Sequence, residues 1–181
     1  SRKGVGVSIS FQSILTEIGE ESYSMDKNDL FVRKMGAIYF LRHFSRYPKL
    51  GKYEIEFVCW LLGDQKAELV EFIRKFYPED SREQWSDEVY AESNDIEAFA
   101  AELLNGLKAI DILHKHQIRQ FIKTTLTRNT KRLNYRGKSD LEKTCHLAQQ
   151  MFNLASHEID LVTFLFIIST YEAPENLFDI E

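Results

Sequence analysis

Histidine and cysteine side chains are the first candidates for metal chemistry in this sequence, which has five histidines and two cysteines among its 181 residues. His114 and His116 are two positions apart, so their side chains would diverge by about 200° on a helix. Cys145 and His146 are adjacent, and one helix cannot present both to the same ion. The sequence contains neither an HExxH motif nor paired cysteines at zinc-binding spacing. We therefore expect no metal site.

Groups suited to acid–base or nucleophilic catalysis are also few. His157, Glu158 and Asp160 lie close together in the sequence, but the start of a helix explains them better. Cys59 lies in an apolar stretch, where burial would raise the pKa of its thiol and make it unreactive. The sequence contains no GxxxxGK[ST] phosphate loop and no serine nucleophile elbow. We predict no catalytic residues, no cofactor and no enzymatic activity.

One segment has a charge pattern suited to binding an anionic partner. From Ile112 to Ser139 there are eight Lys or Arg and no acidic residue, in a chain whose formal net charge is −5. On a helical wheel, Ile118, Ile122 and Leu126 gather on one side and the basic residues gather on the other. We expect this helix to end or bend near residues 127–129 and a basic loop to follow it. The candidate anionic-partner-binding residues are Lys115, Arg119, Lys123, Arg128, Lys131, Arg132, Tyr135, Arg136 and Lys138.

The basic segment 115–138 has three interpretations. A row of cations beside Tyr135 is what binding to a phosphate backbone and stacked bases requires. The sequence pI near 5.6 argues against non-specific affinity for nucleic acid. Residues 79–102 hold nine acidic side chains against one base, Arg82, so the two segments could instead pair within the fold. The third interpretation is the acidic surface of a protein partner.

The elements that would position these residues are predicted to be helices. Only eight Gly and three Pro interrupt the chain, and apolar residues recur at helical spacing along most of it. Asn28, Asn94, Ser139 and Ser156 are the expected helix caps, with Glu97 and Glu142 completing capping boxes after Asn94 and Ser139. We predict an all-α, compact domain of about seven or eight helices, with a short N-terminal strand or arm.

The predicted organisation has four segments that together form one compact unit. Residues 1–10 form a flexible arm, 11–77 an N-terminal helical part, and 78–93 an acidic connector or short solvated helix. Residues 94–181 form a C-terminal helical part, which includes a helix-turn-helix-like pair over 139–171. In that pair, Asn153 is expected in the left-handed conformation at the turn. The second helix, IDLVTFLFIIS, is expected to be mostly core, which argues against reading of DNA by this helix.

The C-terminal stretch also resembles part of a known family. Residues 141–181, about a fifth of the chain, contain an LA…L…E…L helix pair. They are similar to helical regions found just ahead of the ATPase module in some bacterial AAA+ proteins. The resemblance implies a regulatory or partner-binding domain belonging to a longer ATPase, and it carries no ATP site onto this chain. The final PENLFDIE offers a candidate docking segment formed by Leu177, Phe178 and Ile180, which could equally pack on its own domain.

The cellular context follows from the cysteines and from hydropathy. The two cysteines form no CxxC pair, so we expect free thiols in a reducing, cytoplasmic setting. The most apolar run, LVTFLFII, is far shorter than the ~20 residues that span a bilayer. We predict a non-catalytic helical protein-interaction or regulatory domain, with a protein partner or an attached ATPase module. The alternative is a nucleic-acid-binding protein that uses residues 115–138. The oligomeric state stays open.

Overall fold

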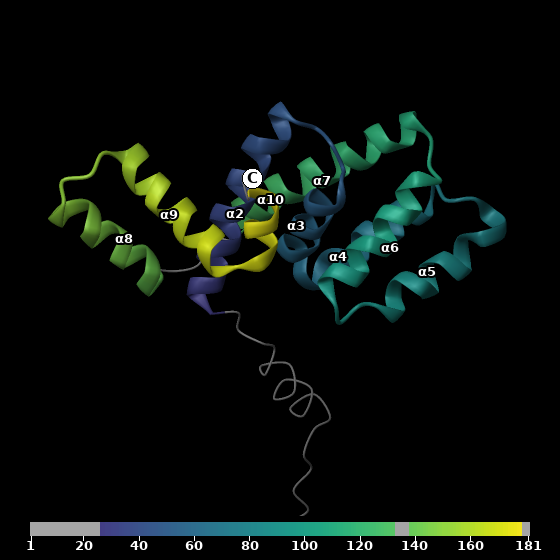
Figure 1. The fold of residues 1–181 in the computed structure, drawn as a ribbon, viewed down its shortest axis with the longest axis horizontal. Helices are drawn as coiled ribbons and strands as arrows, with labels where there is room; N and C mark the ends of the chain where they lie inside the picture. Colours follow the sequence, from purple (N-terminus) through teal and green to yellow (C-terminus); the bar gives the residue numbers. More distant parts are fainter. Residues whose placement is uncertain (1–25, 133–137, 179–181) are drawn as a thin grey trace, which may run out of the picture.

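A computed structural model describes residues 26–132 and 138–178, and it confirms the all-α fold class (Figure 1). The predicted N-terminal arm lies outside the described residues. Short 3₁₀ turns at Gly63–Gln65 and Glu79–Ser81 precede the fourth and fifth helices. The helices are α2 (Lys27–Arg46), α3 (Lys52–Leu62), α4 (Lys66–Arg74), α5 (Arg82–Ala91), α6 (Ile96–Lys108), α7 (Ile112–Arg132), α8 (Asp140–Met151), α9 (Ser156–Thr170) and α10 (Glu172–Phe178).

The helices share one main hydrophobic core. Helix α3 packs on α6 and α10, α2 packs on α7, and α10 also packs on α9. The core includes side chains from α2 through α7 and from α10, such as Phe40, Phe57, Phe99 and Ile122. Residues 11–77 and 94–181 therefore contribute to the same core. Figure 1 shows α8 and α9 at one end of the molecule and α5 at the other, with α2, α3 and α10 between them.

Several predicted helix ends are confirmed. Gly63 ends α3 with a φ of 53°, a conformation that costs glycine little because it has no Cβ. Asn153 has a φ of 51° in the turn between α8 and α9. The Ser139 side chain accepts a hydrogen bond from the Glu142 N–H, 3.0 Å away, at the start of α8. Local sequence was sufficient at these positions because each signal acts within one helical turn.

Three predicted caps were misplaced by one or two residues. Helix α6 is capped by Asp95, whose carboxylate accepts from the Ala98 N–H at 3.0 Å, and not by Asn94. Helix α9 begins after Ala155 rather than being capped by Ser156. Asn28 lies inside α2, and its amide oxygen accepts from the Leu141 N–H at 2.9 Å. Asn28 therefore provides a hydrogen-bond acceptor for a backbone N–H in the first turn of α8, although the two residues are 113 positions apart in the chain.

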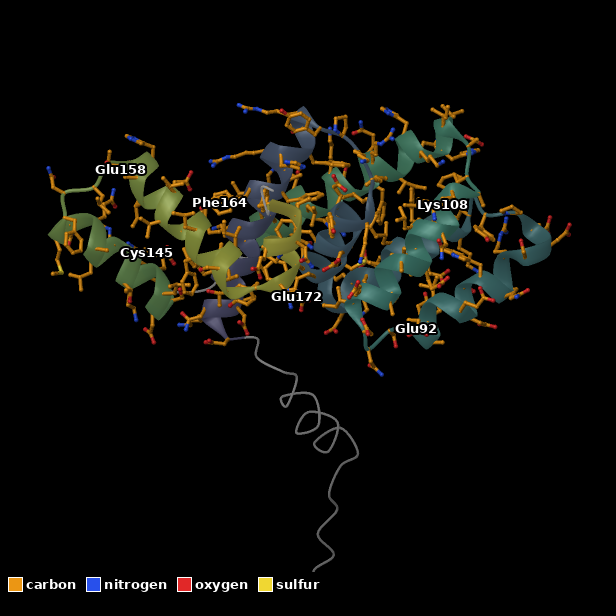
Figure 2. All side chains as sticks on the ribbon, in the orientation of Figure 1. Glu92, Lys108, Cys145, Glu158, Phe164 and Glu172 are labelled. Carbon is orange, nitrogen blue, oxygen red and sulfur yellow. The ribbon has the colours of Figure 1, made fainter. Side chains whose placement is uncertain are left out.

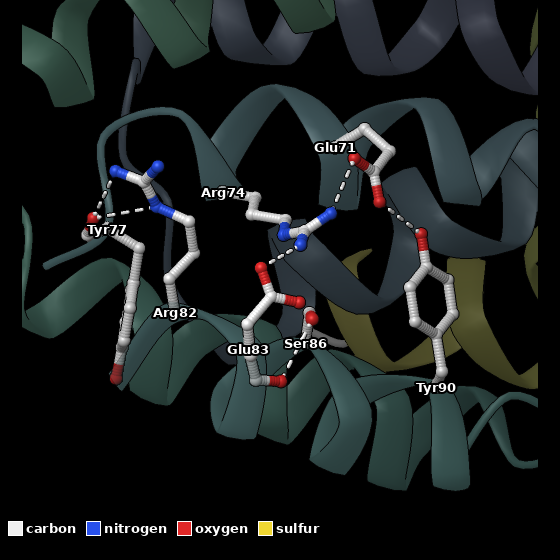
Figure 3. A network of polar contacts seen from close by, with 7 residues as sticks. All are labelled: Glu71, Arg74, Tyr77, Arg82, Glu83, Ser86 and Tyr90. Atoms are coloured by element: carbon white, nitrogen blue, oxygen red, sulfur yellow. Dashed lines mark hydrogen bonds and ion pairs between the residues drawn. The ribbon is translucent and has the colours of Figure 1, made fainter. Parts of the chain in front are cut away.

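The predicted acidic connector contains a packed helix. Helix α5 buries Trp85 and Val89 in the main core. The indole lies directly over Gly106 on α6, where an added Cβ would approach its ring to 2.5 Å. Figure 3 shows the polar contacts between α5 and α4: Arg74 pairs with Glu83, and the Tyr90 hydroxyl donates to the Glu71 carboxylate at 3.0 Å. Sequence reasoning missed the narrow apolar side of α5 because most residues of this segment are acidic or polar.

Helix α7 is longer than predicted. It continues through Arg132, so the expected end near residues 127–129 is wrong. Ile118, Ile122 and Leu126 are buried on one side, as the helical wheel predicted. None of the helices within the described residues is long and apolar enough to cross a membrane.

Candidate interaction surfaces

The basic side chains of α7 form a row along the helix that is half-buried at Lys115, Arg119 and Lys123 and exposed at Lys131. Lys115, Arg119, Lys123 and Lys131 are spaced at multiples of four residues, so they follow one slowly turning face of the helix. Successive members of such a row are about 6 Å apart along the helix axis. Lys123 also lies over the ring of Phe44, 5.6 Å from its centroid. The helix thus holds its predicted cations in fixed register along one edge of the molecule.

The structure describes only some of the other predicted basic residues. Arg128 is exposed and pairs with Glu68 of α4, at 3.4 Å between Nη2 and Oε2. Lys138 is exposed just before α8. Arg132 ends α7, but its side chain is outside the described set, as are Tyr135 and Arg136.

The acids of residues 79–102 do not neutralise α7 within the described residues. Glu97 pairs with Lys52 of α3 at 2.6 Å, and Glu83 pairs with Arg74 of α4. Among the described side chains, the ion pairs of α7 are with Glu68 and Asp111, neither of which belongs to the expected acidic segment. Pairing of α7 with residues 79–102, one of the three interpretations, therefore does not occur among the described ion pairs.

The N-terminal half of the row opens into a small pocket, here called the basic pocket. Its volume is about 190 Å³. Lys115 and Arg119 form one wall, Lys108 at the end of α6 and Lys49 before α3 bring two more cations, and three leucines form the apolar part. The basic pocket is lined by Lys49, Leu50, Leu104, Leu107, Lys108, Lys115 and Arg119. Sequence reasoning missed Lys49 and Lys108 because neither belongs to a charge run.

A second surface is formed by α8 and α9, which project as a hairpin from the rest of the molecule (Figure 1). Figure 2 marks this hairpin with Cys145 and Glu158, whereas Lys108 lies toward the opposite end. The hairpin is anchored to α2 by Tyr39, whose hydroxyl donates to the Asp160 backbone oxygen at 3.0 Å or its carboxylate at 3.1 Å. The Tyr39 ring packs edge-on against Phe164, with centroids 5.2 Å apart. These contacts fix which side of α9 is covered.

The remaining sides of the hairpin expose large apolar residues, between 40% and 70% accessible to solvent. On α9 they form two i,i+4 pairs on the arc that faces away from α2. Another pair lies near the end of α8, next to the turn. This hairpin surface consists of Leu147, Met151, Phe152, Leu161, Val162, Leu165 and Phe166. The expectation that the second helix is mostly core is therefore wrong, since only Thr163 and Ile167 of α9 are buried.

The candidate docking segment at the C-terminus is largely engaged with its own domain. Leu177 and Phe178 belong to α10 and pack against the core, and Ile180 lies outside the described residues. The Phe178 ring meets Phe57 and Phe164, with centroid distances of 5.9 and 5.1 Å. Of the two alternatives for this segment, the described residues adopt packing on the chain itself.

The thiols and histidines are dispersed. Burial raises the pKa of the Cys59 thiol to about 12, so this sulfur stays protonated and inert. Cys145 is half-buried beside the Thr163 hydroxyl, 3.7 Å away, and both cysteines are free. Among the side chains that the structure describes, no three His, Cys, Asp or Glu are grouped so that they could hold a metal ion.

No protein-family model, no curated protein and no solved structure matches this chain. Its function must therefore be inferred from its own surfaces and their chemistry.

Proposed function

We propose that this chain is a non-catalytic helical protein-interaction or regulatory domain, and that the hairpin surface is its docking site. The observation that supports this most directly is the exposure of seven large apolar side chains on one two-helix element. Such residues scattered singly are normal on protein surfaces, whereas a group on adjacent helices marks a place where another surface binds.

The size of the hairpin surface is suited to protein recognition. With roughly 150 Å² for a fully exposed large side chain, the lower end of the range for aromatic residues, these seven together present on the order of 600 Å² at their exposed fractions. That value is at the upper end of the ~300–600 Å² of the largest apolar patch on a typical monomer. It approaches the ~800 Å² that each partner contributes to a standard interface.

The occupant we propose is a second copy of this chain. A two-fold axis pairs the same surface of both copies, so that every contact of one residue with a second residue occurs twice, and an apolar face then covers an apolar face. Packing of α8 and α9 against their symmetry equivalents would form a four-helix bundle, a geometry in which rows of side chains three and four residues apart interdigitate. The hairpin projects from the body, so a second hairpin can approach it without displacing α2 or α10.

Sedimentation velocity over a hundredfold range of protein concentration tests this proposal. We expect the wild-type chain to form a dimer and the Leu161→Asp/Leu165→Asp variant to stay a monomer, because a buried carboxylate without a partner strongly opposes association. The matched control is Ile112→Asp, which removes an apolar side chain that is 82% exposed elsewhere on the molecule. This control should dimerise as the wild type does.

Two results contradict the proposal. One is a wild-type chain that stays monomeric throughout the range, and the other is a hairpin variant that dimerises as tightly as the control. Far-UV circular dichroism of every variant shows whether the helical fold is kept, so that loss of dimer is not mistaken for unfolding.

The regulatory part of the proposal is supported by the resemblance of residues 141–181 to helices that precede an ATPase module. We propose that pairing of hairpin surfaces would bring two attached or associated ATPase modules together. Sequencing the gene beyond the codon for Glu181 tests the attached form. A downstream GxxxxGK[ST] motif supports it, and an immediate stop codon excludes it.

A second candidate function is nucleic-acid binding through the basic row of α7. The specific observation in its favour is that Lys115, Arg119 and Lys131 have no ionic partner among the described residues. Fluorescence anisotropy with single- and double-stranded oligonucleotides at two salt concentrations tests it. Affinity that falls steeply with salt and is lost in Lys123→Glu/Lys131→Glu supports the candidate, and absence of binding at low salt removes it.

A further inference from the structure

We propose that the basic pocket is a binding site for a phosphate-type oxyanion, either a phosphate ester or a pyrophosphate. This inference is independent of the hairpin surface and does not rest on either function proposed above. It rests on the four cations that line the pocket, on one buried donor without a partner, and on the small volume of the pocket.

The charge of the basic pocket is uncompensated. Its lining includes four Lys or Arg side chains and no carboxylate. Lys49, Lys115 and Arg119 make no ion pair with any described residue, and Lys108 donates only to the Asn105 amide oxygen at 3.1 Å. The acid nearest along α7, Asp111, is engaged by its own helix, where it accepts from the His114 N–H at 2.9 Å. Four cations line this one small pocket although their mutual repulsion disfavours it, and the attraction of a bound anion would offset that repulsion.

Arg119 supplies the second, independent observation. Its Nε atom is buried and has no hydrogen-bond partner within the described structure. A guanidinium N–H that is removed from water normally finds an acceptor, because an unsatisfied donor is costly. Arg119 lines the basic pocket, so an oxyanion there can accept hydrogen bonds from its guanidinium, and Arg is the residue whose fork of N–H donors fits phosphate oxygens.

The dimensions of the basic pocket favour one anionic group over a whole cofactor. Its volume of about 190 Å³ is below the ~300–1,000 Å³ of pockets that enclose drug-sized ligands. Leu50, Leu104 and Leu107 form the apolar part of the lining, and apolar surroundings strengthen the attraction between the cations and an anion. The ligand therefore places its charged group in the pocket and leaves the rest of its structure outside.

The number of cations selects phosphate over carboxylate. A carboxylate carries one negative charge, whereas a phosphate monoester carries about −1.5 to −2 at neutral pH and offers three acceptor oxygens. Pyrophosphate carries more charge still. Four cations match this larger charge and can contact several phosphate oxygens at once. A single carboxylate has too little charge to engage all four.

Isothermal titration calorimetry with inorganic pyrophosphate tests the site on the full chain. We expect saturable binding with one site per chain. The Lys115→Gln/Arg119→Gln variant should weaken it at least about tenfold, because charge-assisted hydrogen bonds are lost. Lys108→Gln removes an exposed side chain from the pocket rim and keeps the test valid if the double variant does not fold. It should weaken binding by a smaller factor.

The matched control is Lys131→Gln, which removes one cation from the same helix outside the basic pocket. It should leave the affinity for pyrophosphate within about twofold, since screening weakens charges that are more than a Debye length apart. Two results overturn the proposal: no saturable binding, or a loss in Lys131→Gln as large as that in Lys108→Gln.

Competition separates the sources of the phosphate group. If a single-stranded oligonucleotide displaces pyrophosphate in a manner that requires Lys115 and Arg119, the phosphate belongs to nucleic acid. If pyrophosphate binds and the oligonucleotide does not displace it, the ligand is a small phosphate compound. The oligonucleotide arm can fail while the pyrophosphate arm succeeds, so the site and the nucleic-acid function are judged separately.

Discussion

At the scale of single residues, burial makes the Cys59 thiol unreactive. Cys59 is fully buried on α3, and desolvation, the largest cause, raises its thiol pKa from 9.0 to about 12. In the folded state Cys59 therefore stays a neutral thiol. Cys59 thus acts as a small apolar residue of the core, and its ionisation becomes coupled to unfolding at high pH.

This coupling predicts a pH dependence of stability. Between pH 9 and 12 the unfolded chain releases the Cys59 proton while the folded chain retains it, so the unfolded state binds fewer protons and stability falls as pH rises. The slope from this group is at most about 1.4 kcal/mol per pH unit, and the group contributes no slope well below pH 9. We expect Cys59→Ala to lose stability less steeply than the wild type above pH 9. Urea denaturation at a series of pH values measures this.

Val58→Ala is the control for this prediction. Val58 is also fully buried on α3, so its truncation lowers stability at every pH but leaves the thiol in place. Equal slopes for Cys59→Ala and Val58→Ala would contradict the assigned role of the thiol.

At the scale of elements, the hairpin of α8 and α9 is held to the body by a small set of contacts on α2. Tyr39 donates to Asp160 and packs on Phe164, and Ile167 completes a small second hydrophobic cluster with Phe31 and Val32. Arg42 adds an ion pair to Asp160 at 2.9 Å. Because most of the hairpin is exposed, the buried contacts decide its position.

The two polar anchors of the hairpin should differ in strength. Tyr39→Phe removes a partly buried hydroxyl that donates to a backbone oxygen or a carboxylate, and we expect a loss of about 1–2 kcal/mol in the free energy of unfolding. Arg42→Gln removes an ion pair whose arginine is 63% exposed, and we expect a loss below about 1 kcal/mol.

Hydrogen exchange measured by mass spectrometry locates the effect of each anchor. Tyr39→Phe should speed exchange in α8 and α9 while α3 and α6 keep wild-type protection. If Arg42→Gln destabilised the chain more than Tyr39→Phe, or if exchange rose evenly over all helices, the buried hydroxyl would not be the main polar anchor.

At the scale of the whole molecule, α10 joins the hairpin to the body. Phe178 packs against both hydrophobic clusters, and its ring contacts His43, Phe57 and Phe164 from three different helices. A segment read as a candidate docking peptide is therefore a structural connection. Helix α10 packs on both α3 and α9.

Removal of this connection should lower the stability of the whole chain. Phe178→Ala deletes a partly buried ring, and we expect a loss of about 2–4 kcal/mol in the free energy of unfolding, somewhat below the value for fully buried phenylalanines. Chemical denaturation followed by circular dichroism measures it. Ile112→Ala, at a highly exposed position, should change stability by less than about 0.5 kcal/mol. Similar losses in both variants would show that α10 does not join the two clusters.

The sequence by itself determined the features that act over a few residues. Helical spacing of Ile118, Ile122 and Leu126 identified the buried side of α7, and Gly63 and Asn153 identified two helix ends. These features need no tertiary structure, because the period of the helix and the conformation of a turn are set by neighbouring residues. The all-α class followed from the same local signals.

The tertiary structure alone decided which of those faces would be covered and which charges would meet. An apolar helix such as α9 reads as core, but no other described helix covers Leu161 and Leu165. Lys49 and Lys108 are isolated in the sequence and join Lys115 only because α3, α6 and α7 pack together. Helical periodicity indicates that a helix has an apolar or a basic side. Whether another helix covers that side, and whether distant charges come together, depends on contacts between residues far apart in the chain.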